Sequence, residues 1–221
     1  KASESFDLEV TAVTNDGSTV TTNYQPGQIQ LLLDRTGPAS GGADGTFTYG
    51  GSGSITSALS PSYQSVSLEA FSSGVSTYAS ASYSEVGLLN LALQDSNYGG
   101  ASITVAGDAI NIGRFIPDHF TVSASNGAFA NSCGGFTYIG QSFSYDPSSL
   151  PSLTITAKNG ASTPATTVNY TETGYQKLSA NDVTRAWPTT DSTLTLVSSP
   201  AGTPGTVSVG GSAGESTFTF N

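Results

Sequence analysis

The segment RFIPDHF, from Arg114 to Phe120, places the only histidine of the chain, His119, directly after Asp118. In many hydrolases an aspartate orients a histidine, which in turn takes a proton from a serine or cysteine nucleophile. A catalytic site of this kind needs such a nucleophile as its third member. The sequence offers Cys133, its single cysteine, and Ser212, which stands in a Gly-Gly-Ser-Ala-Gly match to G-x-S-x-G.

The serine motif does not fit its surroundings. A nucleophile elbow lies between a strand and a helix, and its acid and histidine follow later in the chain. Ser212 is instead followed by a strand-like alternating pattern, and no histidine comes after it. A cysteine enzyme that uses Cys133 and His119 stays open as one hypothesis, but no positioned nucleophile motif supports it. We therefore predict that the chain is not an enzyme and has no catalytic residue.

RFIPDHF has a simpler interpretation as a joint between two domains. Pro117 fixes its own φ angle and biases Ile116 toward an extended conformation, which suits a corner between two strands. The predicted boundary near Gly113 gives one domain over 1–113 and a second over 114–221. The predicted joint consists of two aromatic anchors and the polar residues around a proline, namely Arg114, Phe115, Pro117, Asp118, His119 and Phe120. We expect Arg114 to pair with an acid, Asp118 to accept backbone N–H bonds and His119 to donate to a carbonyl.

Calcium is the one metal that the sequence leaves open. One histidine and one cysteine cannot form a usual structural zinc site. Calcium binds oxygen ligands, which scattered carboxylates can supply. The weak candidates on or near the predicted joint are Asp95, Asp108 and Asp118, with Glu85 as a further acid. Because no D-x-D-x-D run is present, solvated acidic loops are the simpler alternative, and we expect no other cofactor.

The composition narrows the class of protein. Sixteen acidic and six basic residues give a formal net charge of −10 over 221 residues, which disfavours contact with nucleic acid or anionic lipid. No window approaches the ~18 consecutive apolar residues of a spanning helix, so we predict no membrane span in this segment. Only 10% of residues are charged, and Ser, Thr, Gly and Asn supply the polarity. Such neutral polar residues suit an extracellular β-protein.

Apolar residues alternate with Ser and Thr at period two, which predicts strands. The predicted strands lie in Phe6–Val13, Val66–Ala70, Leu89–Leu93, Leu153–Ala157, Leu194–Leu196 and Thr217–Phe220. Asp16-Gly17, Gly50-Gly51, Asn126-Gly127 and Asn159-Gly160 separate them, and such pairs favour tight turns. This rhythm predicts an all-β fold of two tandem Ig-like β-sandwich domains.

An internal repeat supports two related units. LEVTAVTNDGSTVTTNY over 8–24 and LTITAKNGASTPATTVNY over 153–170 share an alternating strand, an Asn-Gly or Asp-Gly turn, a Thr-rich return and a final Asn-Tyr. The second unit has fewer residues after its Asn-Tyr than the first. We therefore expect the chain to be a segment of a longer protein, with the second sandwich incomplete at its C-terminal end and its last strand leaving an unpaired edge.

Two aromatic residues raise the alternative of a carbohydrate-binding module. Trp187 and Tyr175 lie in an irregular stretch of the second unit, and aromatic rings on loops can form platforms for sugars. A single Trp is more often part of a core. The other tyrosines lie mostly in strand-like contexts, where packing is the simpler interpretation.

The second half of the chain resembles a known family. IGRFIPDHFTVSASNGAFANSCGGFTYIGQSF, followed by LTITAKN and TTVNY, is similar to the MshQ-like proteins of the mannose-sensitive haemagglutinin pilus system, a type IV pilus system. The matching pieces are RF-x-PDHF, C-x-x-FTY-x-GQ-x-F and an Ala-x-Asn turn before Asn-Tyr. They cover 112–170 well, and the first unit matches more loosely. The resemblance implies an exported component of the pilus system and carries over no catalytic residue.

These observations predict a non-catalytic structural and adhesive protein. We expect it at the bacterial cell surface, associated with a pilus, where it gives rigid spacing and docking or adhesion. Pilus or other surface subunits are the expected partners. Glycans are the alternative ligand, bound by Trp187 and Tyr175.

Overall fold

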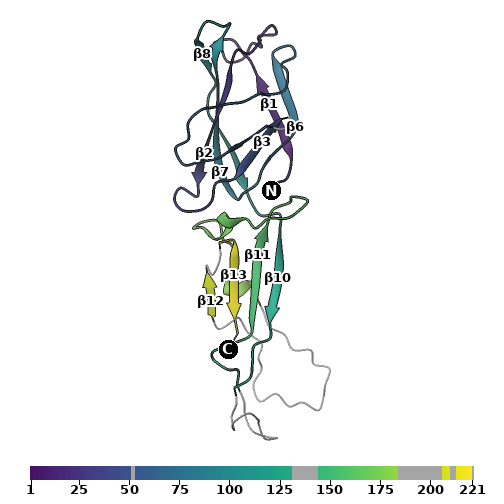
Figure 1. Ribbon diagram of the computed structural model, residues 1–221, viewed down its shortest axis with the longest axis vertical. Coiled ribbons are helices and arrows are strands. Elements are labelled where there is room, and N and C mark those ends of the chain that lie inside the picture. The colour runs from purple at the N-terminus through teal and green to yellow at the C-terminus, as the bar shows by residue number, and fades with distance from the viewer. Residues whose placement is uncertain (51–52, 131–143, 184–205, 210–212, 221) are drawn as a thin grey trace.

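The computed structural model describes residues 1–50, 53–130, 144–183, 206–209 and 213–220, and the following account concerns these residues. They form two β units stacked end to end (Figure 1). Apart from two short 3-10 helices, η1 (Val168–Thr171) and η2 (Ala180–Asp182), the regular elements described are all strands. The predicted all-β fold is therefore confirmed.

The first unit is a sandwich of two antiparallel sheets. One sheet has the order β1 (Phe6–Thr11), β6 (Val75–Tyr83), β3 (Thr46–Gly50) and β4 (Gly53–Thr56). The other has the order β5 (Gln64–Ser65), β2 (Ile29–Gly37), β7 (Gly87–Tyr98) and β8 (Ile103–Ala106), and β9 (Ile110–Phe115) also pairs with β7.

Alternating side chains build the core between these sheets. In β2 every second residue is buried, so that Leu31 and Leu33 point inward while their neighbours are only partly covered. Phe47 and Tyr83 face them from the other sheet and are 0% exposed. Each such side chain contributes about 1.5–3 kcal/mol by its burial. The buried Tyr83 hydroxyl is satisfied, since it lies 3.0 Å from Ser57 Oγ and accepts from the Gly45 amide.

The second unit contributes one four-stranded antiparallel sheet among the described residues. Its order is β10 (His119–Ser125), β11 (Ser152–Lys158), β13 (Glu215–Thr219) and β12 (Thr206–Val209). Ile155, Ala157 and Phe218 are buried on one face of this sheet. On the other face, the hydroxyls of Thr154 and Thr217 lie 3.3 Å apart.

The internal repeat is visible in the backbone hydrogen bonds. Ala12 donates to Gly74 O at 2.8 Å and accepts from Thr21 N at 2.9 Å. In the second unit, Ala157 donates to Gly214 O at 2.9 Å and accepts from Thr167 N at 3.0 Å. β1 therefore corresponds to β11, and β6 corresponds to β13.

The correspondence continues through the Asn-Tyr pair that ends each repeat. Tyr24 N donates to Thr21 O, and Tyr170 N donates to Thr167 O, at 3.1 and 3.2 Å. Asn23 thus occupies the same place in the first unit as Asn169 in the second. One strand breaks the symmetry: β10 pairs with the outer edge of β11, whereas among the described residues β1 pairs only with β6.

Three features differ from the sequence predictions. Val66–Ala70 is not a strand, because β5 ends at Ser65. Val66 N still donates to Ile29 O of β2 at 3.0 Å, but Val66 and Leu68 pack against the core from a loop. The last strand is not an unpaired edge, since β13 lies between β11 and β12. Several strands were not predicted at all, among them β2, β3, β4 and β6. The predicted strand at Leu194–Leu196 lies outside the described residues.

The chain changes from one unit to the other within RFIPDHF. β9 pairs with β7 of the first unit as far as Phe115, and β10 of the second unit begins at His119. The predicted boundary between residues 113 and 114 therefore falls inside β9.

The repeat predicts a matched pair of sensitive glycines. Gly74 and Gly214 both have a φ angle of 83°, and an added Cβ would lie 2.5 Å from Thr21 O or 2.6 Å from Thr167 O. Gly17 has a φ angle of 72° but open space around it. We expect Gly17→Ala to cost about 1 kcal/mol through its backbone alone. Gly74→Ala and Gly214→Ala should each cost about 1–3 kcal/mol more. Urea unfolding of the three variants measures this, and equal losses would contradict the proposed equivalence.

Candidate functional site at the joint between the two units

The joint contains a buried carboxylate, Glu85, at the end of the first unit. It lies between β6 and β7 and is 7% exposed. Its Oε1 accepts from Val168 N at 2.8 Å, and its Oε2 accepts from Asn169 N at 3.2 Å and from Val86 N at 3.0 Å. Burial raises the pKa of Glu85, while the backbone hydrogen bonds and the charge of Arg35 oppose that rise. The carboxylate therefore caps the start of η1 in the other unit.

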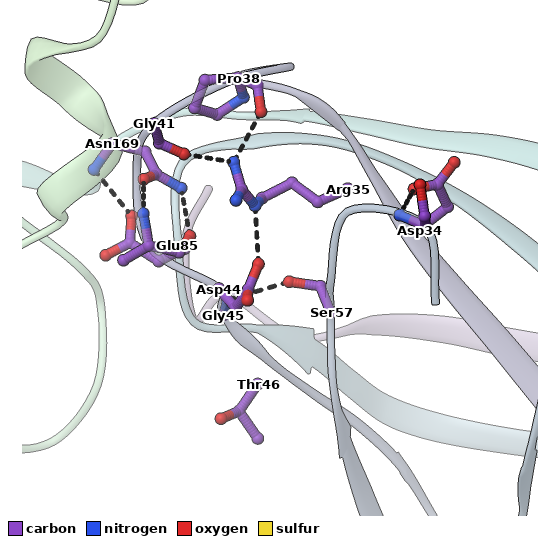
Figure 2. Close-up of polar contacts among 12 residues, drawn as sticks. Asp34, Arg35, Pro38, Gly41, Asp44, Gly45, Thr46, Ser57, Glu85 and Asn169 are labelled. Carbon is purple, nitrogen blue, oxygen red and sulfur yellow. Dashed lines mark hydrogen bonds and ion pairs between the residues drawn. The ribbon is translucent and has the colours of Figure 1, made fainter. Parts of the chain in front are cut away.

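Asn169 of the second unit binds the backbone of the first unit through its side chain. Its side chain is completely buried. Oδ1 accepts from Ala43 N at 2.6 Å, and Nδ2 donates to Ala43 O at 2.9 Å and to Val86 O at 3.0 Å. Figure 2 shows this carboxamide beside the Glu85 carboxylate, and we call the two residues with their partners the clasp. The amide acts like a short piece of backbone that pairs with the other unit.

Arg35 shapes the loop that presents Ala43 to the clasp. It is 4% exposed, and its Nη1 donates to Pro38 O at 2.6 Å and to Gly41 O at 3.0 Å (Figure 2). Its Nε donates to Asp44 at 2.8 Å, so both ends of the loop are tied to one guanidinium. Gly42 leaves room for the approach, because a Cβ there would lie 2.5 Å from Asn169 Oδ1.

The first residues of the chain form a second set of contacts at the joint. Ala2 is 0% exposed, donates to Ile116 O at 2.8 Å and accepts from Gly160 N at 2.9 Å. Asn159 of the second unit donates to Ser84 O at 3.2 Å. These bonds fix the corner at Ile116 and the turn after β11 to the end of the first unit that faces the joint.

A small apolar cluster lies beside the clasp. It joins Val86 of the first unit to Ala157 and Tyr170 of the second, with Tyr175 and Leu178 packed against it. The Tyr170 hydroxyl accepts from the Leu178 amide at 3.2 Å, so it is satisfied inside the second unit. A groove of about 460 Å³ borders this cluster and reaches Arg114 and Phe120.

The aromatic anchors predicted for the joint behave differently from each other. Phe115 is buried at 6% exposure in the first-unit core, between Phe6 and Tyr83. Phe120 packs edge-on against Tyr170 at 5.2 Å but is 42% exposed. The proline corner between them, at Pro117, joins β9 to β10.

The polar residues of RFIPDHF find other partners than those predicted. Arg114 lies over the ring of Tyr175 at 5.0 Å rather than pairing with an acid. Asp118 accepts from Lys1 Nζ at 3.1 Å instead of from backbone amides. His119 Nδ1 lies 2.8 Å from Asp118 Oδ2, not on a carbonyl. The hydrogen bond from His119 is the main cause that lowers the pKa of Asp118.

The calcium candidates do not converge on one point. Asp95 is buried under the far end of the first unit, where it accepts from the amides of Gly27 and Gln28 and from the Tyr24 hydroxyl. Burial opposes its ionisation, but these hydrogen bonds outweigh burial and lower the pKa of Asp95. Asp108 is exposed on the loop between β8 and β9, and Asp118 is at the joint. The described part of the chain contains no group of three or more His, Cys, Asp or Glu arranged to hold a metal.

Three sequence candidates lie outside the described residues, namely Cys133, Trp187 and Ser212. Tyr175 is described and is partly buried at the joint, where Arg114 covers its ring. It is therefore a packing residue of the joint. Among the described residues, no helix has the length and apolar character that crossing a membrane requires.

The clasp itself was not recognised from the sequence. Glu85 stood out only as a further acid near the joint, and Asn169 only as a marker of the repeat. The one available signal was the repeated Asn-Tyr, which indicated that this Asn had a defined place in each unit. Its partners lie 83 and 126 positions away, so no local pattern could identify them.

The clasp predicts that the side-chain amide of Asn169 contributes much more to the free energy of unfolding than the amide of its repeat counterpart, Asn23. Asn169→Asp keeps the shape but removes the N–H groups that bond Ala43 O and Val86 O. We expect it to cost about 3 kcal/mol of the free energy of unfolding, because the two buried carbonyls lose their donor and the substitution also buries a negative charge. Asn23→Asp at the exposed counterpart should cost less than about 0.5 kcal/mol. Denaturant unfolding gives both values, and similar costs for the two variants would show that the clasp does not hold the joint.

The comparisons with known proteins give one match. The family model described as DUF6701, third domain, matches residues 85–221, which is more than half of the chain. The comparison with curated proteins finds no match, and neither does the comparison with solved structures. The matched range begins at the clasp carboxylate and includes β7 and β9 of the first unit as well as the whole second unit. The chain therefore belongs to the DUF6701 family.

Proposed function

We propose that this chain is an exported, non-catalytic structural segment of a pilus or another bacterial cell-surface assembly, where it provides rigid spacing and supports docking or adhesion. The clasp is the observation that carries this proposal. A fully buried side chain of one unit makes three hydrogen bonds to the backbone of the other. Such a contact is expected where two units must keep a fixed orientation.

Rotating one unit against the other would be energetically costly. Separating the units would leave the Asn169 carboxamide without its partners, and Glu85 would keep only the amide of Val86 among its present partners, unless water entered. Each buried polar group left unpaired costs about 1–3 kcal/mol, and a charged one costs more. The contacts of Ala2 and Asn159 would break in the same movement. A tilted arrangement is therefore expected to be rare in solution.

The surface location rests on composition and resemblance. A formal charge of −10, few charged residues of either sign and an all-β architecture suit a protein outside the cell. The RF-x-PDHF and C-x-x-FTY-x-GQ-x-F pieces support a link to a pilus system. For the glycan alternative, Tyr175 is half-buried at the joint with Arg114 over its ring, and Trp187 lies outside the described residues.

Rigidity can be measured as a distance distribution between the two units. Ser18 and Ser125 are exposed, one in each unit, and can be replaced by cysteine and spin-labelled in a Cys133→Ser background. We expect one narrow distribution for the otherwise unchanged chain and for the Asn23→Asp control. Asn169→Asp should broaden it because the clasp is lost. A broad distribution before any clasp change would contradict the role as a rigid spacer.

The cellular location can be tested on bacteria that produce the protein. Antibodies raised against this chain should label intact cells, since an exported segment is accessible without permeabilisation. An antibody against a cytoplasmic protein serves as the control for cell integrity. Cells that lack the segment should also adhere less. Labelling that appears only after permeabilisation would overturn the surface role, whatever the rigidity of the joint.

A further inference from the structure

The end of the first unit that lies away from the joint repeats the docking end of the second unit. In Figure 1 this far end lies near β8. It is built from the end of β1 and the return that leads to Tyr24, which correspond to the end of β11 and the return to Tyr170. In the second unit these features contact the first unit. In the first unit the corresponding Ala12 and Tyr24 are partly buried within the unit itself, and Thr22 and Asn23 are exposed.

The outer edge of β1 lacks the strand that covers β11. β10 runs antiparallel to β11, with Phe120 opposite Ala157 and Val122 opposite Ile155. The repeat places Ala12 and Val10 at the positions of Ala157 and Ile155. Because Ala12 N points toward β6, the backbone groups of the alternate residues Thr11 and Val13 point away from it. Thr11 lies opposite Val75 of β6 and Val13 lies opposite Val20, but β1 is the edge of its sheet, so no described strand of the sheet lies on its outer side.

A pocket lies where the missing strand would place its first large side chain. Phe120 sits beside Ala157 and packs against Tyr170. The corresponding residues Ala12 and Tyr24 border a cavity of about 290 Å³, where Phe71 of the first unit packs edge-on against Tyr24 at 5.0 Å. Its other walls include Val10, Phe71, Tyr98 and Val105. Several apolar side chains around this end are unusually exposed, including Val13 at 41%, Val20 at 40% and Tyr98 at 41%.

The backbone amides at this end also match those that the clasp uses. Glu85 accepts from Val168 N and Asn169 N at the start of η1. The corresponding amides belong to Thr22 and Asn23, which are exposed and donate to no described residue. An approaching carboxylate would find the same pair of donors there.

We propose that the far end of the first unit docks another unit of the same kind, which adds an antiparallel strand to the outer edge of β1. The strand resembles Phe120–Ala124, with apolar side chains at alternate positions, and its first large side chain fills the pocket beside Ala12 and Tyr24. This goes beyond the spacing role, because it assigns a partner and a binding surface. The matched family model is described as a third domain, so other domains of the family can supply the strand. The inference does not depend on where the protein resides.

The test uses a peptide with the sequence RFIPDHFTVSAS, residues 114–125, added to the whole chain. We expect saturable binding by fluorescence anisotropy and slower hydrogen exchange at the amides of Thr11 and Val13. A Phe120→Ser peptide should bind at least about tenfold more weakly, because it cannot fill the pocket. On the protein, Tyr98→Ala removes an exposed pocket wall and should weaken binding without unfolding the sandwich. Tyr145→Ala alters an aromatic residue of the second unit and should leave binding unchanged.

Three outcomes would overturn the proposal. The first is an absence of binding at about 1 mM peptide. The second is equal binding of a scrambled peptide, which would indicate a general apolar pocket for small ligands. The third is protection at β11 rather than at β1, which would show that the peptide only replaces β10. Because the experiment is performed on purified protein, its failure would leave the surface role of the chain standing.

Discussion

A buried carboxamide fixes the architecture of this protein. Asn169 is removed from water on every side, so its donors and acceptor must be satisfied by protein groups. The groups that satisfy it, Ala43 and Val86, belong to the other unit. The second unit can therefore bury this residue only in one orientation on the first. An apolar contact of the same size would tolerate sliding, because hydrophobic burial has no direction.

The rest of the first unit supports that contact. The loop with Ala43 is not part of a sheet, and it is held by the Arg35 guanidinium, which is itself buried. Arg35 belongs to β2, so the rigid core positions the loop. Glu85 lies two residues after Tyr83, the last residue of β6. The two sheets of the sandwich thus each deliver one half of the docking surface for the second unit.

The sequence predicted some of the strands and missed others, such as β2, together with the features that depend on distant partners. β1, β7, β11 and β13 were found because half-buried strands show an apolar residue at every second position. Val66–Ala70 has the same pattern, but there the backbone bond from Val66 N to Ile29 O does not continue into a strand, and Val66 and Leu68 pack on the core from a loop. An alternation of apolar and polar residues indicates which side chains face the core, but it does not indicate which groups the backbone bonds.

At the joint, too, the local sequence indicated the place but not the distant partners of its residues. RFIPDHF marked the place of the joint because a proline corner and two aromatic residues are local features. Its polar residues were assigned wrong partners, since Lys1 and Tyr175 lie far from it in the sequence. The residues that hold the joint most firmly, Glu85 and Asn169, are unremarkable in their own surroundings. Only the fold brings them together, across 84 positions.

The repeated Asn-Tyr pair has one local geometry and two environments. Tyr24 and Tyr170 both turn back onto the threonine three residues earlier, at 3.1 and 3.2 Å. Beyond this turn they differ: the Tyr24 hydroxyl donates to the buried Asp95, whereas Tyr170 lies under β10 and the joint cluster. The Asn before each Tyr is exposed in one unit and fully buried in the other. The local sequence therefore encodes the turn at the end of a unit, and the neighbouring unit decides whether that end is an open surface or a clasp.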